Sequence, residues 1–138
     1  MTMTFDTKIA VAVRDDLPTW QRLNMTAFLV SGIAASTGEM VGEDYEDASG
    51  NRHLPMFRQP VLIYEAPAAK MRLLYERAMR REVRFALFID ELFATGNDDD
   101  NRAAMRAVAA DDLRIAGLAL RADRKIVDKI FDGVKLHP

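Results

Sequence analysis

The apolar run Lys8-Ile-Ala-Val-Ala-Val13 leads directly into the polar turn Arg14-Asp-Asp-Leu-Pro18. Because the run is almost continuously apolar, it predicts a strand that is covered on both faces. From Thr19 the apolar residues recur every three or four positions, which predicts a helix that ends near Gly38. A buried strand followed at once by a helix indicates an α/β fold.

The apolar residues of this first helix lie on more than one side. The residues at helical spacing are Trp20, Leu23, Ala27, Val30 and Ala34. Much of the other side is filled by Met25, Phe28 and Leu29. We therefore expect this helix to be buried nearly all round.

Three further strand–helix pairs follow along the chain. Strands are expected at residues 61–64, 83–89 and 113–120, and helices from Pro67, from Asp98 and from Asp123, the last stopping at Gly133. The helix after Pro67 has an apolar stripe made by Met71, Leu74, Tyr75, Ala78 and Met79. Strands that alternate with helices predict a mainly parallel sheet with helices on both faces, hence a three-layer α/β/α sandwich.

Residues 38–59 are the least regular part, and they are rich in glycine and acidic side chains. Ser49-Gly-Asn51 is a turn signal, so this excursion from the fold is expected to contain a hairpin. With 138 residues the chain forms one domain over 1–138.

The net charge of −2 argues against a purely electrostatic nucleic-acid binder. No cysteine and only two histidines are present, so neither a metal site nor a cofactor is expected. Residues 1–6 lack the basic and apolar regions of a signal peptide, and no apolar run could span a membrane. We expect a cytoplasmic protein with no membrane partner.

Two strand ends carry the most interesting polar residues. Asp90 follows the strand at 83–89, and Arg14 ends the first strand. Open α/β sheets bind their ligands at such ends, so the two could share one crevice, with Asp90 as base or orienting group and Arg14 as anion clamp. The alternative is that they are turn and cap residues.

Other candidates are weaker. Asn24 and Ser31 are polar, lie seven residues apart on the first helix and either line a cleft or bond to nearby backbone. His53 is a lone loop histidine. The run Asp98-Asp-Asp100 favours a helix N-terminus over a calcium loop. The basic residues between 70 and 84 are typical of a solvated helix face, although they could also meet phosphates.

Two motifs resemble those of type 2 peptidyl-tRNA hydrolases. Ile9-Ala-Val-Ala-Val-Arg14-Asp-Asp16-Leu17 is similar to that family's V-V-R-x-D-L opening. The segment from Val127-Asp-Lys-Ile130 to Gly133-Val-Lys-Leu136 is similar to its V-D-K-V-T-G-H-L-K-L ending. Pro60-Val-Leu-Ile-Tyr64 and residues 85–90 occur in the same order and lengths. The resemblance implies a four-stranded mixed sheet in which one strand is antiparallel, and a homodimer.

A closer resemblance is carried by Trp20-Gln-Arg-Leu-Asn24-Met-Thr-Ala-Phe28-Leu-Val-Ser-Gly32. This stretch is similar to the domain of unknown function 2000 family, an uncharacterised bacterial family that resembles the hydrolases in fold. The hydrolase motif G-K-x-A-A-Q-x-x-H-A is not kept in this helix. Its lysine is replaced by Asn24, its glutamine by Phe28 and its histidine by Ser31. A lysine that precedes this motif in the hydrolases is replaced by Pro18. Asp90 alone matches, at the aspartate of D-A-G-R-T-Q.

Three functions remain open at this point. The first is binding of a small molecule or peptide in a crevice lined by Arg14, Asn24, Ser31 and Asp90, with His53 as a further binding candidate. The second is a hydrolase of altered chemistry with Asp90 as base and His53 or Arg14 as partner. The third is peptidyl-tRNA hydrolysis, with tRNA held by residues 70–84; the missing lysine disfavours it. We rank binding first, and whether the protein is an enzyme stays open.

Overall fold

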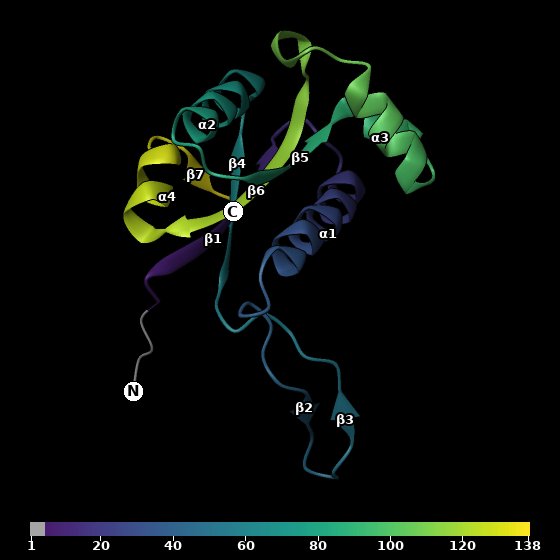
Figure 1. Ribbon diagram of the computed structural model, residues 1–138, viewed down its shortest axis with the longest axis vertical. Helices are drawn as coiled ribbons and strands as arrows, with labels where there is room; N and C mark the ends of the chain where they lie inside the picture. Colours follow the sequence, from purple (N-terminus) through teal and green to yellow (C-terminus); the bar gives the residue numbers. More distant parts are fainter. Residues whose placement is uncertain (1–4) are drawn as a thin grey trace.

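The computed structural model describes residues 5–138 and shows a mixed α/β fold around one five-stranded sheet (Figure 1). The sheet contains β1 (Thr7–Arg14), β4 (Val61–Ala66), β5 (Phe85–Ile89), β6 (Ile115–Asp123) and β7 (Lys135–Leu136). The helices are α1 (Thr19–Ser36), α2 (Ala68–Arg80), α3 (Asp98–Arg106) and α4 (Arg124–Ile130). Two short 3-10 turns are η1 (Asp90–Ala94) and η2 (Ala110–Asp112), and a separate hairpin pairs β2 (Tyr45–Glu46) with β3 (Arg52–His53).

The strand order is β5-β6-β1-β4-β7. Of the neighbouring pairs in this sheet, β1 and β4 are parallel, whereas β1–β6, β5–β6 and β4–β7 are antiparallel. The expectations of a mainly parallel sheet, of four strands and of a single antiparallel strand were therefore wrong. The additional strand, β7, has two residues, both exposed, so it carries no apolar pattern from which a strand could be predicted.

The side chains of β1 alternate between two hydrophobic layers. Ala10 and Ala12 pack with α2 and α4, whereas Ile9, Val11 and Val13 pack with α1. Helices thus cover both faces of the sheet, as the three-layer expectation required: α2 and α4 lie on one side and α1 on the other (Figure 1).

The orientation of α1 differs from the expectation. Its buried residues are Met25, Leu29 and Ile33. The helix is not buried all round, because Trp20 is 61 % exposed, Leu23 69 % and Phe28 55 %. The reason lies in β6, where a Cβ atom at Gly117 would stand 2.6 Å from the sulfur of Met25. The absence of a side chain at Gly117 lets the Met25 face of α1 approach the sheet closely.

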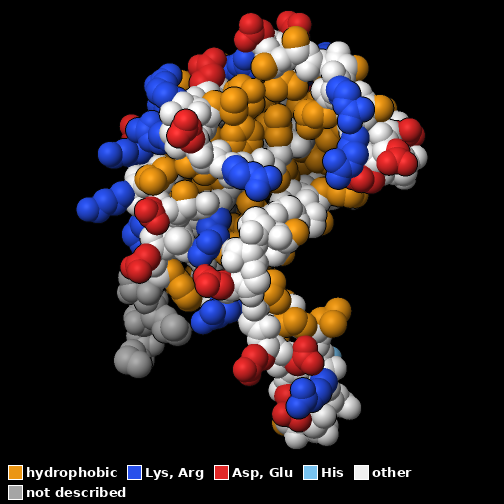
Figure 2. Space-filling model, viewed as in Figure 1, with side chains coloured by type: hydrophobic (Ala, Val, Ile, Leu, Met, Phe, Trp, Pro, Cys, Tyr) orange, Lys and Arg blue, Asp and Glu red, His pale blue; other side chains and the backbone are white. Residues whose placement is uncertain are grey.

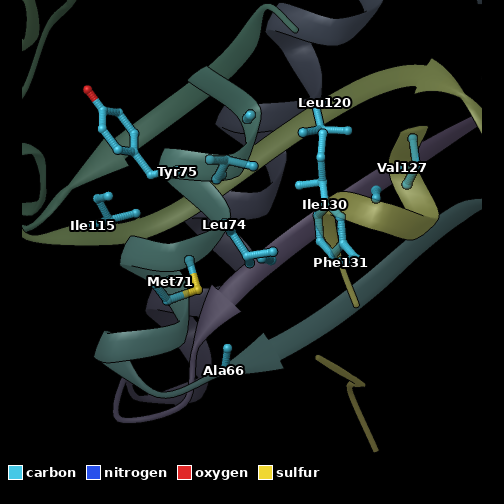
Figure 3. Packing of buried hydrophobic residues seen from close by; sticks show 13 residues of the cluster. Ala66, Met71, Leu74, Tyr75, Ile115, Leu120, Val127, Ile130 and Phe131 are labelled. Carbon is cyan, nitrogen blue, oxygen red and sulfur yellow. The ribbon is translucent and has the colours of Figure 1, made fainter. Parts of the chain in front are cut away.

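On the opposite side, α2 packs against α4 and the sheet (Figure 3). Met71, Leu74, Tyr75 and Ala78 are buried as the stripe predicted, but Met79 is exposed. The basic residues of α2 also contribute, because Lys70 Nζ donates to the Gly133 carbonyl at 2.7 Å and Arg77 Nη1 donates to the Ile130 and Asp132 carbonyls at 3.0 and 2.8 Å. These side chains hold the C-terminal end of α4.

Residues 41–58 form a hairpin arm that extends away from the sheet at the bottom of the view in Figure 1. At its tip the Asp47 carboxylate accepts hydrogen bonds from the Ser49 and Asn51 amides, and Gly50 has a φ of +84°. Buried Met40 and the bridge between Val41 and Phe57 anchor its base. The hairpin expected within residues 38–59 is confirmed.

Within residues 5–138 no helix has the length and apolar character needed to cross a membrane. The inference about a signal peptide rested on residues 1–6, and positions 1–4 lie outside the described residues. The acidic run at 98–100 occupies the first turn of α3, as expected. The N-cap itself is Asn97, whose side chain accepts from the Asp100 amide at 2.8 Å.

Candidate functional site

A hollow of about 310 Å³ lies where β1 and β5 end and β6 begins. Its charged lining residues come from four segments of the chain: Arg14, Asp16, Arg72, Asp90 and Arg114. We call this site the arginine hollow. It exists because β1 and β5 both run antiparallel to β6, so that their C-terminal ends meet the N-terminal end of β6 at one edge of the sheet.

Arg14 is the centre of the site and is only 9 % exposed. Its Nη1 donates to Asp90 Oδ1 at 2.7 Å and to the Ile115 carbonyl at 3.2 Å, while its Nε donates to Asp16 Oδ1 at 2.6 Å. Burial alone lowers the pKa of the Arg14 guanidinium, but hydrogen bonds and charge from Asp90 and Asp16 outweigh it, so this pKa lies above its ordinary value. Arg14 is therefore a fixed, permanently charged group.

The third guanidinium nitrogen of Arg14 is not used in this network. Within residues 5–138, Nη2 of Arg14 makes no hydrogen bond, although the side chain lines the hollow. A guanidinium can donate five hydrogens in a fixed plane, so donors remain for a ligand. The two hydrogens that remain are both on Nη2, so Arg14 can donate to a carboxylate or phosphate oxygen from this one nitrogen.

Two further arginines stand in the wall with weaker partners. Arg72 lies 3.5 Å from Glu76 and 3.6 Å from Asp111, and Arg114 lies 3.4 Å from Glu91. Each of these ion pairs is long and includes one exposed side chain, so it is weak and can be exchanged for another anion. Arg72 Nη1 also donates to the Ala110 carbonyl at 2.8 Å. The hollow also reaches the first residue of α2, Ala68, where the helix has no side-chain cap and no acidic residue in its first turn.

The structure brings together two of the five residues predicted for the site, Arg14 and Asp90. Asn24 lines a different hollow, beside Trp20, and the Ser31 hydroxyl donates to the Phe28 carbonyl on the exposed face of α1. His53 lies on the hairpin arm, where its Nε2 is 3.0 Å from Asp47 Oδ2. Asn24, Ser31 and His53 therefore do not line the arginine hollow.

Sequence reasoning missed a second, half-buried polar cluster. Arg22 Nη1 lies 3.1 Å from Glu65 Oε2 and 2.9 Å from His137 Nε2, and Arg22 Nε donates to the Leu17 carbonyl at 2.8 Å. These bonds tie the turn after β1 to β4 and to the C-terminal segment. The sequence does contain a signal for this cluster, because Arg22 is the only charged residue in the sequence of α1.

The described part of the chain groups no three His, Cys, Asp or Glu side chains in a way that could hold a metal ion. Arg14, held in place by Asp90, can orient a ligand by donating hydrogen bonds to it. The fold and the arginine hollow together define a mixed α/β protein with an arginine-lined hollow at one edge of its sheet.

The chain belongs to the family described as protein of unknown function DUF2000, whose model matches residues 7–138. A similar solved structure is that of Atu0240, a protein of unknown function from Agrobacterium tumefaciens strain C58. The two are 49 % identical with a TM-score of 0.95, and the match covers 98 % of this chain and 100 % of that one. No curated protein matches the chain. The family resemblance noted in the sequence is thus confirmed, whereas the likeness to peptidyl-tRNA hydrolases and the homodimer stay predictions.

Proposed function

We propose that the protein binds a small molecule in the arginine hollow through an anionic group, a carboxylate or a phosphate, that Arg14 holds. The observation that carries this proposal is the free Nη2 of a buried arginine whose other donors are already fixed by Asp90, Asp16 and the Ile115 carbonyl. Because these partners hold the guanidinium in place, little conformational entropy is lost when a ligand binds.

Charge and size support the same ligand class. Three arginines line the hollow with two aspartates, and the carboxylates of Glu76, Asp111 and Glu91 balance Arg72 and Arg114 only through contacts of 3.4–3.6 Å, which a bound anion can replace. The volume of about 310 Å³ lies at the lower end of the range of small-molecule sites, roughly 300–1,000 Å³. A small metabolite therefore fits the hollow, as does the terminal carboxylate of a short peptide.

Asp90 has a positioning role in this proposal. Its Oδ1 accepts a hydrogen bond from Arg14 at 2.7 Å, so the carboxylate orients the arginine. His53, the other partner considered for a hydrolase centred on Asp90, is bonded to Asp47 on the hairpin arm. The form of the altered hydrolase that uses His53 is therefore not supported, whereas the form that uses Arg14 has the pair it requires. We rank binding first because Nη2 of Arg14 makes no hydrogen bond within residues 5–138.

Isothermal titration calorimetry with inorganic phosphate and with acetate tests the proposal on the whole chain. Arg114→Gln removes an exposed donor from the wall, and Arg102→Gln removes an arginine of similar exposure on α3 that pairs with Asp98 outside the hollow. We expect Arg114→Gln to weaken binding of at least one anion, with Arg102→Gln unchanged. Absence of heat with both anions, or equal loss in both variants, would refute the proposal.

A further inference from the structure

A row of four aromatic rings crosses the region between α1 and η1. The ring centroids of Trp20 and Phe93 are 6.4 Å apart, those of Phe93 and Phe88 4.8 Å, and those of Phe88 and Phe28 6.3 Å. The inner rings are buried or half-buried, whereas the two outer rings, Trp20 and Phe28, are more than half exposed. Hydrophobic side chains also gather on the molecular surface over β5, between α2 and α3 (Figure 2).

The outer rings flank a hollow of about 460 Å³ that we call the aromatic hollow. Besides the four rings, its wall contains amide and hydroxyl groups from Asn24, Thr95, Asn97 and Asn101. Apolar walls with a few polar groups converging on them are the usual composition of a small-molecule site. The planes of Trp20 and Phe93 are inclined at 72°, so these rings do not stack, and the exposed indole keeps open surface for a ligand.

The polar groups of the wall have unused hydrogen-bonding capacity. No hydrogen bond from the Asn24 side chain is found in the described residues, and Asn101 uses its Oδ1 to accept from Thr95 while its amide nitrogen stays free. An asparagine side chain offers both donors and acceptors, so it can pair with the edge of a heterocyclic ring or with a carboxamide.

The charge of the wall restricts the ligand. Asp98 contributes a carboxylate, which pairs with Arg102 Nε at 2.8 Å, and among residues 5–138 neither a lysine nor an arginine lines the aromatic hollow. Ring faces are the negative part of the aromatic quadrupole and attract cations. An anion is therefore disfavoured here, which distinguishes this hollow from the arginine hollow.

We propose that the aromatic hollow is a second binding site, for a planar nitrogen heteroaromatic ring that is neutral or cationic. The ring stacks on Trp20 beside Phe28, and Asn24 pairs with a ring nitrogen or carboxamide at its edge. This inference does not depend on the arginine hollow binding an anion.

Trp20 supplies a direct readout because it is the only tryptophan of the chain. Its indole N–H gives a single, unambiguous signal in a nitrogen–proton correlation spectrum of the labelled protein. The probes are nicotinamide, 1-methylnicotinamide and nicotinate, which share one ring size and are neutral, cationic and anionic at neutral pH. We expect saturable movement of the indole signal with the first two and much weaker binding of nicotinate.

Phe28→Leu and Asn24→Leu change exposed positions and keep the fold. Each should raise the dissociation constant about 2- to 12-fold, the effect of losing one aromatic pair or one hydrogen bond. Tyr45→Leu, which removes an exposed aromatic ring from the hairpin arm, is the control and should leave the constant unchanged.

Several outcomes would overturn this inference. One is the absence of saturable movement with all three probes, and another is nicotinate binding as tightly as 1-methylnicotinamide. A third is an indole signal that moves when the protein concentration alone is raised, while the mass measured by sedimentation doubles. These two results together would show that a second copy of the chain covers this face. A failure of phosphate to bind would leave the result intact, since phosphate tests the arginine hollow.

Discussion

Replacing Asp90 by Asn removes the charge that faces buried Arg14 while keeping the shape of the side chain. A hydrogen bond to a charged group contributes about 1.5–3 kcal/mol. Removing one partner of a fully buried ion pair costs about 3–5 kcal/mol when the other charge is left alone. Arg14 keeps Asp16 and the Ile115 carbonyl as partners, so the lower range applies. We therefore expect the free energy of unfolding to fall by about 1.5–3 kcal/mol.

Urea unfolding at neutral pH measures this loss. The slope of the unfolding free energy against urea concentration should stay unchanged, because the variant exposes the same surface when it unfolds. Asp16→Asn is the matched control. It removes the second carboxylate bonded to Arg14, but Asp16 is largely exposed, so its loss should cost about 0–1 kcal/mol. If Asp90→Asn is no more costly than Asp16→Asn, the reasoning that Asp90 neutralises a buried charge is wrong.

Three further variants test the packing and the hairpin arm. Gly117→Ala places a Cβ 2.6 Å from the Met25 sulfur, so a thermal or urea melt should show a loss of about 1–3 kcal/mol, and an unchanged melt would contradict the close approach of α1. Arg77→Met removes two hydrogen bonds to carbonyls at the end of α4, so amide hydrogen exchange should become faster in α4 but not in α1. An equal change of the exchange rate in both helices would argue against the role of Arg77 in holding α4. In the arm, the hydrogen bond with His53 and those from the Asn51 and Ser49 amides hold the pKa of Asp47 below its ordinary value of 3.8. This stabilisation is therefore present above pH 3.8 and lost as the pH falls through the folded-state pKa. Protection of the Ser49 and Asn51 amides, measured relative to their intrinsic exchange rates, should fall there, and Asp47→Asn should abolish this pH dependence of the protection.

Periodicity predicted the elements better than their arrangement. The strand at β1, the start of α1 and the buried face of α2 were all predicted, because each has a clear apolar pattern or a clear stop. The exposed face of α1 was not, because apolar residues surround this helix. Its rotation is decided by the space above Gly117, a contact with a strand more than 80 residues away in the sequence that no local pattern encodes.

The rotation of α1 also bears on the site, because only two of the five residues predicted for it lie in the arginine hollow. Arg14 and Asp90 follow directly from the rule that strand ends meet at one edge, and the structure places them 2.7 Å apart. Asn24 and Ser31 depend on the rotation of α1, so they lie on its exposed face and not in the arginine hollow. The sequence pattern places Arg72 among the basic residues of a solvated helix face and gives no sign of Arg114. Both residues come near Arg14 only through the tertiary fold.

Nuclear magnetic resonance can follow the guanidinium of Arg14 directly while inorganic phosphate and acetate are added to the whole protein. We expect the Arg14 signals to move and saturate with at least one anion, and those of Arg102, outside the hollow, to stay in place. Anion binding that leaves the Arg14 signals in place, or no binding at all, would contradict the claim that the arginine hollow is the functional site.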